Sequence, residues 1–262
     1  MKARKLIVGN WKMNASAAGN DALVRALLQA LAAGADTGGS TANQACEVAV
    51  CVPAPYLAQV RALCAGSALA LGAQDVSAHE QGAFTGEVSA PMLKEFGVSY
   101  VIVGHSERRQ YHHETDAAVA EKARAALAQG ITPIVCVGET LAEHETGQTE
   151  QVVKRQLAAV IHANGHCITE VVVAYEPVWA IGTGKTATPE LAQQVHGVLR
   201  AQLRAASDQA GLIPILYGGS MNAGNAASLL GQPDIDGGLV GGASLKALEF
   251  MQIVAAARSE RA

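Results

Sequence analysis

The sequence IVCVGETLAEHETGQTEQVVKRQLAAVIHANGHCITEVVVAYEP, residues 134–177, contains the clearest pattern of strand and helix in the chain. Two continuous apolar runs, Ile134–Val137 and Val171–Tyr175, stand near its ends. Because neither run alternates with polar residues, both predict strands that are buried on two faces, as in a parallel sheet. Between them, apolar residues recur with helical spacing at Val153, Leu157, Val160 and Ile161. A strand, a helix and a second strand in this order indicate a β/α architecture.

The same alternation continues along the rest of the chain. The other apolar runs are Leu6–Val8, Val48–Val52, Ala68–Leu71, Tyr100–Val103, Ile213–Tyr217 and Leu239–Val240. Helical spacing recurs at Leu23, Leu27, Ala30 and Leu31, and again at Leu191, Val195, Val198 and Leu199. Thr188-Pro189-Glu190 predicts a helix start, and Gly130 and Gly165 predict helix ends.

Eight strands that alternate with helices over 262 residues predict an α/β fold, a closed eight-fold parallel β/α barrel (TIM barrel). A doubly wound open sheet is the alternative. No linker divides the chain, so we expect a single barrel domain over residues 1–262. The segment Gly34–Ala45 has the composition of a loop and precedes a strand, so we interpret it as an insertion on the barrel face opposite the active site.

Composition and charge argue against several classes of protein. The net charge is −4 and no basic stripe occurs, so we expect no nucleic-acid partner. No run of about 18 apolar residues occurs, so we expect no transmembrane helix, and Leu6–Val8 is too short for a secretory signal. Five cysteines without a CxxC pair predict reduced thiols in a cytoplasmic protein.

Polar residues and glycines that could bind or convert a substrate follow several of the predicted strands. The active site of a β/α barrel lies at the carboxyl ends of its strands, so these residues are expected to converge. They are Asn10 and Lys12 after the first run, His105 and Glu107 after the fourth, Glu176 after the sixth, Ser220 after the seventh, and Gly241 and Gly242 after the eighth.

Lys12 and Glu107 each have two interpretations. Lys12 is either a surface lysine or a group that holds a phosphate and stabilises negative charge on a carbonyl oxygen. Glu107 is either a first-turn acid that complements a helix dipole or the partner of Lys12. The position of Lys12 at a strand end, beside Asn10 and Trp11, favours the functional interpretation for the lysine.

His105 and Glu176 are the candidates for proton transfer. His105 precedes Ser106-Glu107, which predicts a helix start, and a helix N-terminus favours a neutral imidazole that donates a hydrogen bond. Glu176 follows an apolar run, and Pro177 and Trp179 restrict and desolvate it. Burial would raise the pKa of its carboxyl group, which suits a base near neutral pH. The alternatives are a histidine that serves only the helix start and an acid that pairs with an arginine.

Glycine-rich segments follow the last three predicted strands. The end of WAIGTGKT, residues 179–186, resembles a nucleotide P-loop, but Trp179 stands where that motif requires glycine. We interpret the segment as a closing loop whose backbone amides wrap an anion. Gly218-Gly219-Ser220 and Gly241-Gly242 are either further amide donors for a phosphate or ordinary tight turns.

Signatures of metal sites and of serine hydrolases are missing. His162 and His166 are four residues apart, but Gly165 interrupts the helix that would align them, and HExxH does not occur. GxSxG does not occur either. We therefore expect no metal site.

Eight motifs in order point to one family. They are GNWKMN at 9–14, GAQDVS at 72–77, GAFTGE at 82–87, VIVGHSERR at 101–109, CVGE at 136–139, AYEPVWAIGTGK at 174–185, YGGS at 217–220 and DGGLVGGASL at 236–245. AYEPVWAIGTGK and GHSERR are highly specific. On these residues the chain resembles the triosephosphate isomerase family from Lys5 to near residue 257.

The resemblance implies interconversion of dihydroxyacetone phosphate and glyceraldehyde 3-phosphate in glycolysis and gluconeogenesis, without a cofactor. Glu176 would be the base, and His105 a neutral electrophile. The matching substrate-pocket and phosphate positions are Asn10, Lys12, Gly182, Ser220, Gly241 and Gly242, with Glu107 as the supporting acid and residues 177–187 as the closing lid.

The resemblance also implies a homodimer in which the loop that carries Thr85 packs near the partner's Lys12. Asp75 replaces the more usual Asn at this interface and leaves the local contacts open. Two other functions are weighed against isomerisation. One is a Schiff-base aldolase that uses Lys12 or Lys185, and the other is a phosphate-binding module without catalysis.

Overall fold

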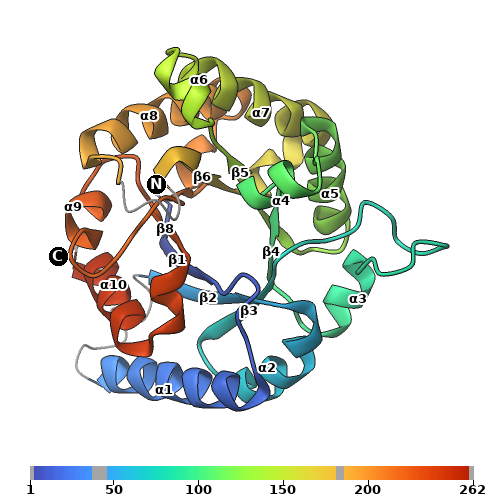
Figure 1. Cartoon of the computed structure of the whole chain (residues 1–262), viewed down its shortest axis with the longest axis vertical. Helices are drawn as coiled ribbons and strands as arrows, with labels where there is room; N and C mark the ends of the chain where they lie inside the picture. Colours follow the sequence, from blue (N-terminus) through green and yellow to red (C-terminus); the bar gives the residue numbers. More distant parts are fainter. Residues whose placement is uncertain (1–2, 37–45, 181–185, 260–262) are drawn as a thin grey trace.

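Eight parallel strands form a closed barrel in a computed structural model that describes residues 3–36, 46–180 and 186–259 (Figure 1). The strands are β1 Lys5–Asn10, β2 Cys46–Val52, β3 Leu69–Ala73, β4 Tyr100–Val103, β5 Thr132–Val137, β6 Val172–Tyr175, β7 Ile215–Tyr217 and β8 Gly237–Val240. Every predicted apolar run overlaps one of them, although the runs at Ala68, Val171 and Ile213 begin one or two residues before the strand. The predicted barrel is confirmed, and the open sheet is wrong because β1 pairs with β8.

The closure between β1 and β8 depends on glycine. Leu6 lies opposite Gly237 and Ile7 opposite Gly238 in this parallel pair. A Cβ atom on Gly237 would stand 1.8 Å from the carbonyl oxygen of Leu6, so no larger residue fits there. The sequence run predicted for this strand was shorter, at Leu239–Val240, because these two glycines carry no apolar signal.

Helices surround the barrel as an outer ring (Figure 1). They are α1 Ala17–Asp36, α2 Leu57–Cys64, α3 Ala90–Glu95, α4 Ser106–Tyr111, α5 Asp116–Ala128, α6 Leu141–Glu145, α7 Thr149–Asn164, α8 Pro189–Ala206, α9 Ala226–Leu230 and α10 Ala247–Ser259. Within the described parts of the chain, no helix combines the length and the apolar character needed to span a membrane.

The predicted helix boundaries are confirmed at three positions. The Thr188 hydroxyl accepts a hydrogen bond from the Leu191 N–H at the start of α8. Gly130 and Gly165 follow α5 and α7 with positive φ, which glycine adopts at little cost. The predicted loop at 34–45 begins later than expected, because α1 continues to Asp36, and residues 37–45 lie outside the described residues.

Two apolar layers hold the barrel together. The interior contains Leu6, Val8, Ala49, Cys51, Ile102, Ile134, Cys136, Val172, Ala174, Leu216 and Leu239. A larger layer fills the space between the strands and the helices. The five cysteines are free thiols, and Cys51 and Cys136 are buried in the barrel interior, as small apolar side chains.

α8 buries a histidine and an arginine against the bottom of the barrel. The His196 ring is fully buried, and its Nδ1 lies 3.1 Å from the carbonyl oxygen of Asp234. Arg200 donates to Asp236 and to the carbonyl oxygens of Ala210 and Ile213. Burial lowers the pKa of His196 to about 4, since the charged ring would lose its hydration.

We predict that His196 makes the folded state sensitive to acid. Between about pH 6.5 and pH 4 the unfolded chain binds a proton at this position that the folded chain does not, so stability falls as pH falls. The loss reaches about 3 kcal/mol at pH 4. Chemical denaturation across this range should show that loss in the wild type and its absence in His196→Gln.

The control is His166→Gln, because His166 is exposed. It should keep the wild-type dependence of unfolding free energy on pH. If His196→Gln also kept the full dependence, the buried neutral histidine would not be its source.

Candidate active site

One cavity of about 380 Å³ lies at the carboxyl ends of the strands. Among its lining residues are seven that the sequence singled out: Asn10, Lys12, His105, Glu176, Ser220, Gly241 and Gly242. They come from the ends of β1, β4, β6, β7 and β8. Glu107 lies beside Lys12 and lines the adjoining groove instead. Gly182 lies outside the described residues.

Lys12 is held in a strained backbone conformation. Its φ is +52°, a region that non-glycine residues seldom adopt and that is often associated with functional sites. The Asn10 Oδ1 accepts the Lys12 N–H at 3.0 Å, and the Gln74 Nε2 donates to the Lys12 carbonyl oxygen at 2.8 Å. The Lys12 Nζ lies 2.5 Å from the Glu107 carboxylate. The structure therefore contains the ion pair that was one interpretation of Glu107.

His105 is itself the cap of α4. Its Nδ1 accepts the Glu107 N–H at 3.2 Å at the predicted helix start. A ring nitrogen that accepts a hydrogen bond carries no proton, so this contact favours a ring that is protonated only at Nε2. The Nε2 lies 2.9 Å from a Glu176 carboxylate oxygen. His105 thus presents its one N–H to the cavity side.

Glu176 is a carboxylate with 2% exposure at the end of β6. One oxygen contacts His105, and the other accepts the Ser106 N–H at 2.8 Å. Two glycines leave room for it: a Cβ on Gly138 would meet the Glu176 carbonyl oxygen at 1.8 Å, and one on Gly218 would meet the Glu176 Cγ at 2.8 Å. The residues that follow β5 and β7 therefore pack closely against Glu176 from both sides.

The contact between His105 and Glu176 shifts the pKa of both groups. Burial, the largest effect, raises the pKa of Glu176, but the His105 ring and the Ser106 N–H outweigh it and the pKa lies below its ordinary value. Burial lowers the pKa of His105, but the Glu176 carboxylate outweighs it and the pKa lies above its ordinary value. The prediction of a raised carboxyl pKa is therefore wrong for this arrangement, because burial also brings donors to the carboxylate.

The segment after Glu176 is tied to two polar groups. Glu139 is fully buried and accepts hydrogen bonds from the Trp179 Nε1 at 2.8 Å and the Tyr175 hydroxyl at 3.1 Å. The Ser220 hydroxyl donates to the Ala180 carbonyl oxygen at 2.8 Å. Ser220 therefore holds the beginning of the predicted lid in this structure, while residues 181–185 of that lid lie outside the described residues.

Sequence reasoning missed the role of Gln74. The motif GAQDVS contains it, and it directly follows β3, so the rule that active-site residues lie at strand ends could have found it. Its Nε2 donates to the carbonyl oxygens of Lys12 and Cys51, at 2.8 and 3.1 Å. Gln74 thereby joins the ends of β1, β2 and β3 under the strained lysine.

Metal and Schiff-base chemistry find little support at this site. Within the described residues, no three His, Cys, Asp or Glu side chains are grouped to hold a metal ion. Lys12 lies in an ion pair with Glu107, not in the apolar pocket that a Schiff-base lysine needs. Lys185, the other lysine considered for that chemistry, lies outside the described residues.

Comparison with known proteins gives one consistent result. The family profile described as Triosephosphate isomerase matches residues 5–257. A protein named triosephosphate isomerase from Paracidovorax citrulli (strain AAC00-1) is 72% identical over 257 residues, which cover 98% of this chain and 100% of the relative. Relatives of the same name from Albidiferax ferrireducens and Delftia acidovorans are 70% and 69% identical, each over 97% of this chain and 99% of the relative.

These matches extend over nearly the full length of the chain, and the barrel agrees with them. The predicted fold, family resemblance and isomerase activity are thereby confirmed. The chain belongs to the triosephosphate isomerase family, the glycolytic isomerases of triose phosphates.

Proposed function

We propose that this chain interconverts dihydroxyacetone phosphate and D-glyceraldehyde 3-phosphate with Glu176 as the base and His105 and Lys12 as stabilisers of the oxyanion. The observation that carries the proposal is that the three side chains line one cavity of about 380 Å³. A cavity of this size suits a small ligand, and its lysine suits a phosphorylated one. A coupled assay with glyceraldehyde 3-phosphate tests the activity directly.

The first step is removal of a proton from the carbon next to the substrate carbonyl. Glu176 turns from His105 and Ser106 toward that carbon and takes the proton, while the C–H electron pair forms a C=C bond and the π pair of the carbonyl moves to its oxygen. The Nε2–H of His105 and the Nζ of Lys12 face the cavity and stabilise the resulting enediolate.

The second step returns the proton to the neighbouring carbon. Protonated Glu176 delivers it there, and the C=C electron pair of the enediolate forms the new C–H bond. The hydroxyl proton on the first carbon passes to the other oxygen, and the oxygen that loses it forms the new C=O bond. All electrons remain within the substrate, so the reaction needs neither an oxidant nor a cofactor. Because the enediolate is reactive toward loss of phosphate, exclusion of water by the lid segment 177–187 protects it.

The phosphate is expected at the ends of β7 and β8. Ser220, Gly241 and Gly242 line the same cavity as Glu176, and a Cβ on Gly241 would lie 3.6 Å from the Lys12 Cε. The lysine is therefore close to the glycine amides that would face the phosphate. Gly182 would complete this set from the lid.

We predict that Glu176→Asp lowers kcat by about 100-fold or more while KM changes little. The shorter side chain leaves the carboxylate about 1 Å or more from the reacting carbon, and misplacement of this size costs about two orders of magnitude. Steady-state kinetics in the coupled assay measures both constants.

The matched control is Glu150→Asp, since Glu150 is an exposed acid on α7 that pairs with Lys154. It should leave both constants unchanged. Wild-type turnover in Glu176→Asp would remove Glu176 from the role of base.

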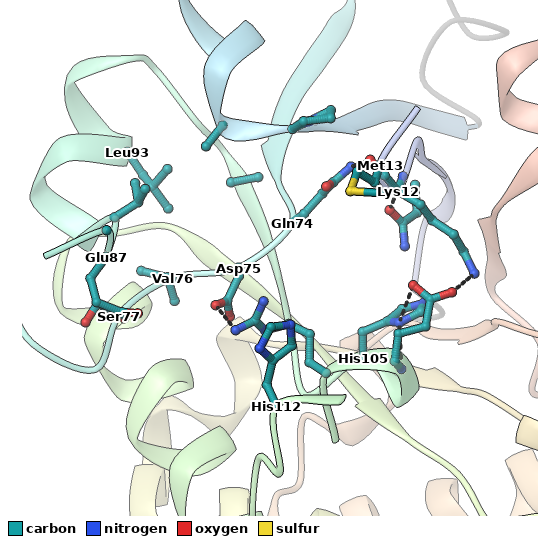
Figure 2. Close-up of a pocket in the computed structure, with 18 of the residues that line it drawn as sticks. Lys12, Met13, Gln74, Asp75, Val76, Ser77, Glu87, Leu93, His105 and His112 are labelled. Atoms are coloured by element: carbon teal, nitrogen blue, oxygen red, sulfur yellow. Dashed lines mark hydrogen bonds and ion pairs between the residues drawn. The ribbon is translucent and has the colours of Figure 1, made fainter. Parts of the chain in front are cut away.

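The chain is further proposed to act as a homodimer in the cytoplasm, folded as one domain. A groove of about 630 Å³ runs beside the active site, and Figure 2 shows Lys12, Gln74, His105 and His112 around it. The segment between β3 and α3 projects beyond the ring of helices (Figure 1) and carries Thr85. A groove and a projecting loop on the same subunit support a dimer in which the loop of each copy inserts into the groove of the other. The five free thiols support a reducing compartment.

Exposed apolar side chains flank this groove. Met13 and Tyr111, which line it, are 96% and 69% exposed, and Phe84 of the projecting loop is 43% exposed. Phe84 is stacked on His79 at 3.8 Å, which stiffens the loop. Large exposed apolar groups near a groove support burial by a second subunit.

Asp75 keeps its charge balanced within its own subunit. It lies 2.8 Å from the Lys122 Nζ and 2.8 Å from the Arg108 Nη2, and Glu114 contacts the same two cations. The four groups form a closed ring with two positive and two negative charges. The aspartate at this position therefore adds no unpaired charge to the proposed interface.

We predict that Tyr111→Asp weakens the dimer about tenfold or more, because an unpaired carboxylate would be buried between subunits. Sedimentation velocity over a dilution series measures the dissociation constant, and specific activity should fall at the same dilution. Leu248→Asp is the control, since Leu248 is also exposed, at 77%, and does not line the groove. Equal dimer strength in the two variants would contradict this interface.

A further inference from the structure

Gln156 is a polar side chain on the apolar face of α7. That face otherwise buries Val152, Val153, Leu157 and Val160 against the barrel. Gln156 is 5% exposed, so its carboxamide must find partners inside the protein. Its partners are both main-chain polar groups of one residue: the Gly138 N–H donates to Oε1 at 2.7 Å, and Nε2 donates to the Gly138 carbonyl oxygen at 3.2 Å.

Gly138 needs these partners because it stands just beyond a strand. β5 ends at Val137, whose carbonyl oxygen accepts the Glu176 N–H at 2.8 Å. Buried main-chain groups beyond the ladder must still be satisfied. A single carboxamide supplies both a donor and an acceptor, so it gives Gly138 the two hydrogen-bond partners that a neighbouring strand gives a residue within the sheet.

Gly138 in turn lies against the main chain of Glu176. A Cβ on Gly138 would come within 1.8 Å of the Glu176 carbonyl oxygen, 2.7 Å of its carbonyl carbon and 3.2 Å of its Cα. Any movement of Gly138 toward β6 therefore pushes the backbone of the base. The position of the Gly138 backbone therefore limits the position of the Glu176 backbone.

Space is available for Gly138 to move away from this contact. A second cavity of about 450 Å³ is lined by Gly138, Gln156, Glu176 and Val178, on the side facing α5, α6 and α7. No closely packed atoms therefore restrict the position of Gly138 on this side. The two hydrogen bonds between Gly138 and Gln156 restrict it instead.

From this geometry we propose that Gln156 is a positioning residue for Glu176, acting through Gly138. It touches neither the substrate cavity nor the carboxylate of the base. The inference rests on the proposed function, because it assumes that Glu176 is the group whose placement limits turnover.

The test is Gln156→Met in the full chain. The thioether has a similar length and leaves both Gly138 groups without partners, so Gly138 shifts and Glu176 with it. We expect kcat to fall about 10- to 100-fold with KM within about threefold, since the phosphate positions lie on other strands. A folded variant with wild-type kcat, or one whose loss lies only in KM, overturns the proposal.

Val160→Ala is the matched control for stability. Val160 is fully buried one turn further along the same helix and does not contact Gly138. The shortened side chain should lower Tm while kcat stays within about twofold. A comparable loss of kcat in this variant would mean that any loosening of α7 slows turnover, and the proposal would fail.

Gln156→Glu gives a second reading if the methionine variant does not fold. A carboxylate accepts the Gly138 N–H but cannot donate to its carbonyl oxygen, whereas the protonated acid does both. At pH 8 this variant should therefore show a kcat about threefold or more below that of the wild type, with KM within about threefold. A folded Gln156→Glu variant with wild-type kcat overturns the proposal.

The wild-type measurements separate the two ideas. If the wild type shows no isomerisation, or if Glu176→Asp is fully active, the proposed function fails. If both behave as proposed and Gln156→Met turns over normally, only the role of Gln156 fails.

Discussion

The burial of the Glu176 carboxylate is the constraint on which the site depends. A charged group with 2% exposure is stable only if donors replace its water. The donors here are the Nε2 of His105 and the N–H of Ser106, both at the start of α4. β4 and β6 both pair with β5, so their carboxyl ends lie one strand apart at the same end of the barrel, and this order places the start of α4 within reach of Glu176.

The same constraint explains which residues around the base are small and which are polar. Gly138 and Gly218 flank Glu176 at distances that leave no space for a Cβ. Once side chains are absent there, the exposed peptide groups need partners of their own. Gln156 satisfies Gly138, and the Gly218 N–H bonds to the Tyr175 carbonyl oxygen at 2.7 Å. The glycines that leave space for Glu176 therefore also require hydrogen-bond partners for their own peptide groups.

The fold and most of the cavity could be predicted from the sequence because their signals are local. Continuous apolar runs mark the buried strands, and the residues that follow them mark the active face. The sequence predicts β8 too short because its first two residues are glycines, which are required by close packing of Gly237 on Leu6 and of Gly238 on Met221 and carry no hydropathy signal. Lys12, His105 and Glu176 stood out because a charged or imidazole group directly after an apolar strand is conspicuous.

The other features depend on contacts between distant residues. Gln74 reaches Lys12 across 62 positions, and Gln156 reaches Gly138 from the middle of a helix face that is mostly apolar. The pKa of Glu176 was predicted in the wrong direction for the same reason. Burial can be inferred from the neighbouring residues in the sequence, but the donors that outweigh it come from α4, about 70 residues earlier.

The pairing of His105 with Glu176 also explains how one rotation can prepare both groups for the proposed reaction. While they touch, each stabilises the charged form of the other. When Glu176 turns to the substrate in the proposed mechanism, it leaves the imidazole and the Ser106 N–H, which lower its pKa most, so the effect of burial prevails over that of Lys12 and raises the pKa. His105 simultaneously loses the carboxylate but keeps the Glu107 N–H at Nδ1, so the neutral ring that can donate to an oxyanion is favoured. The stronger base and the neutral donor are then consequences of the same broken contact, and neither requires a further group to move.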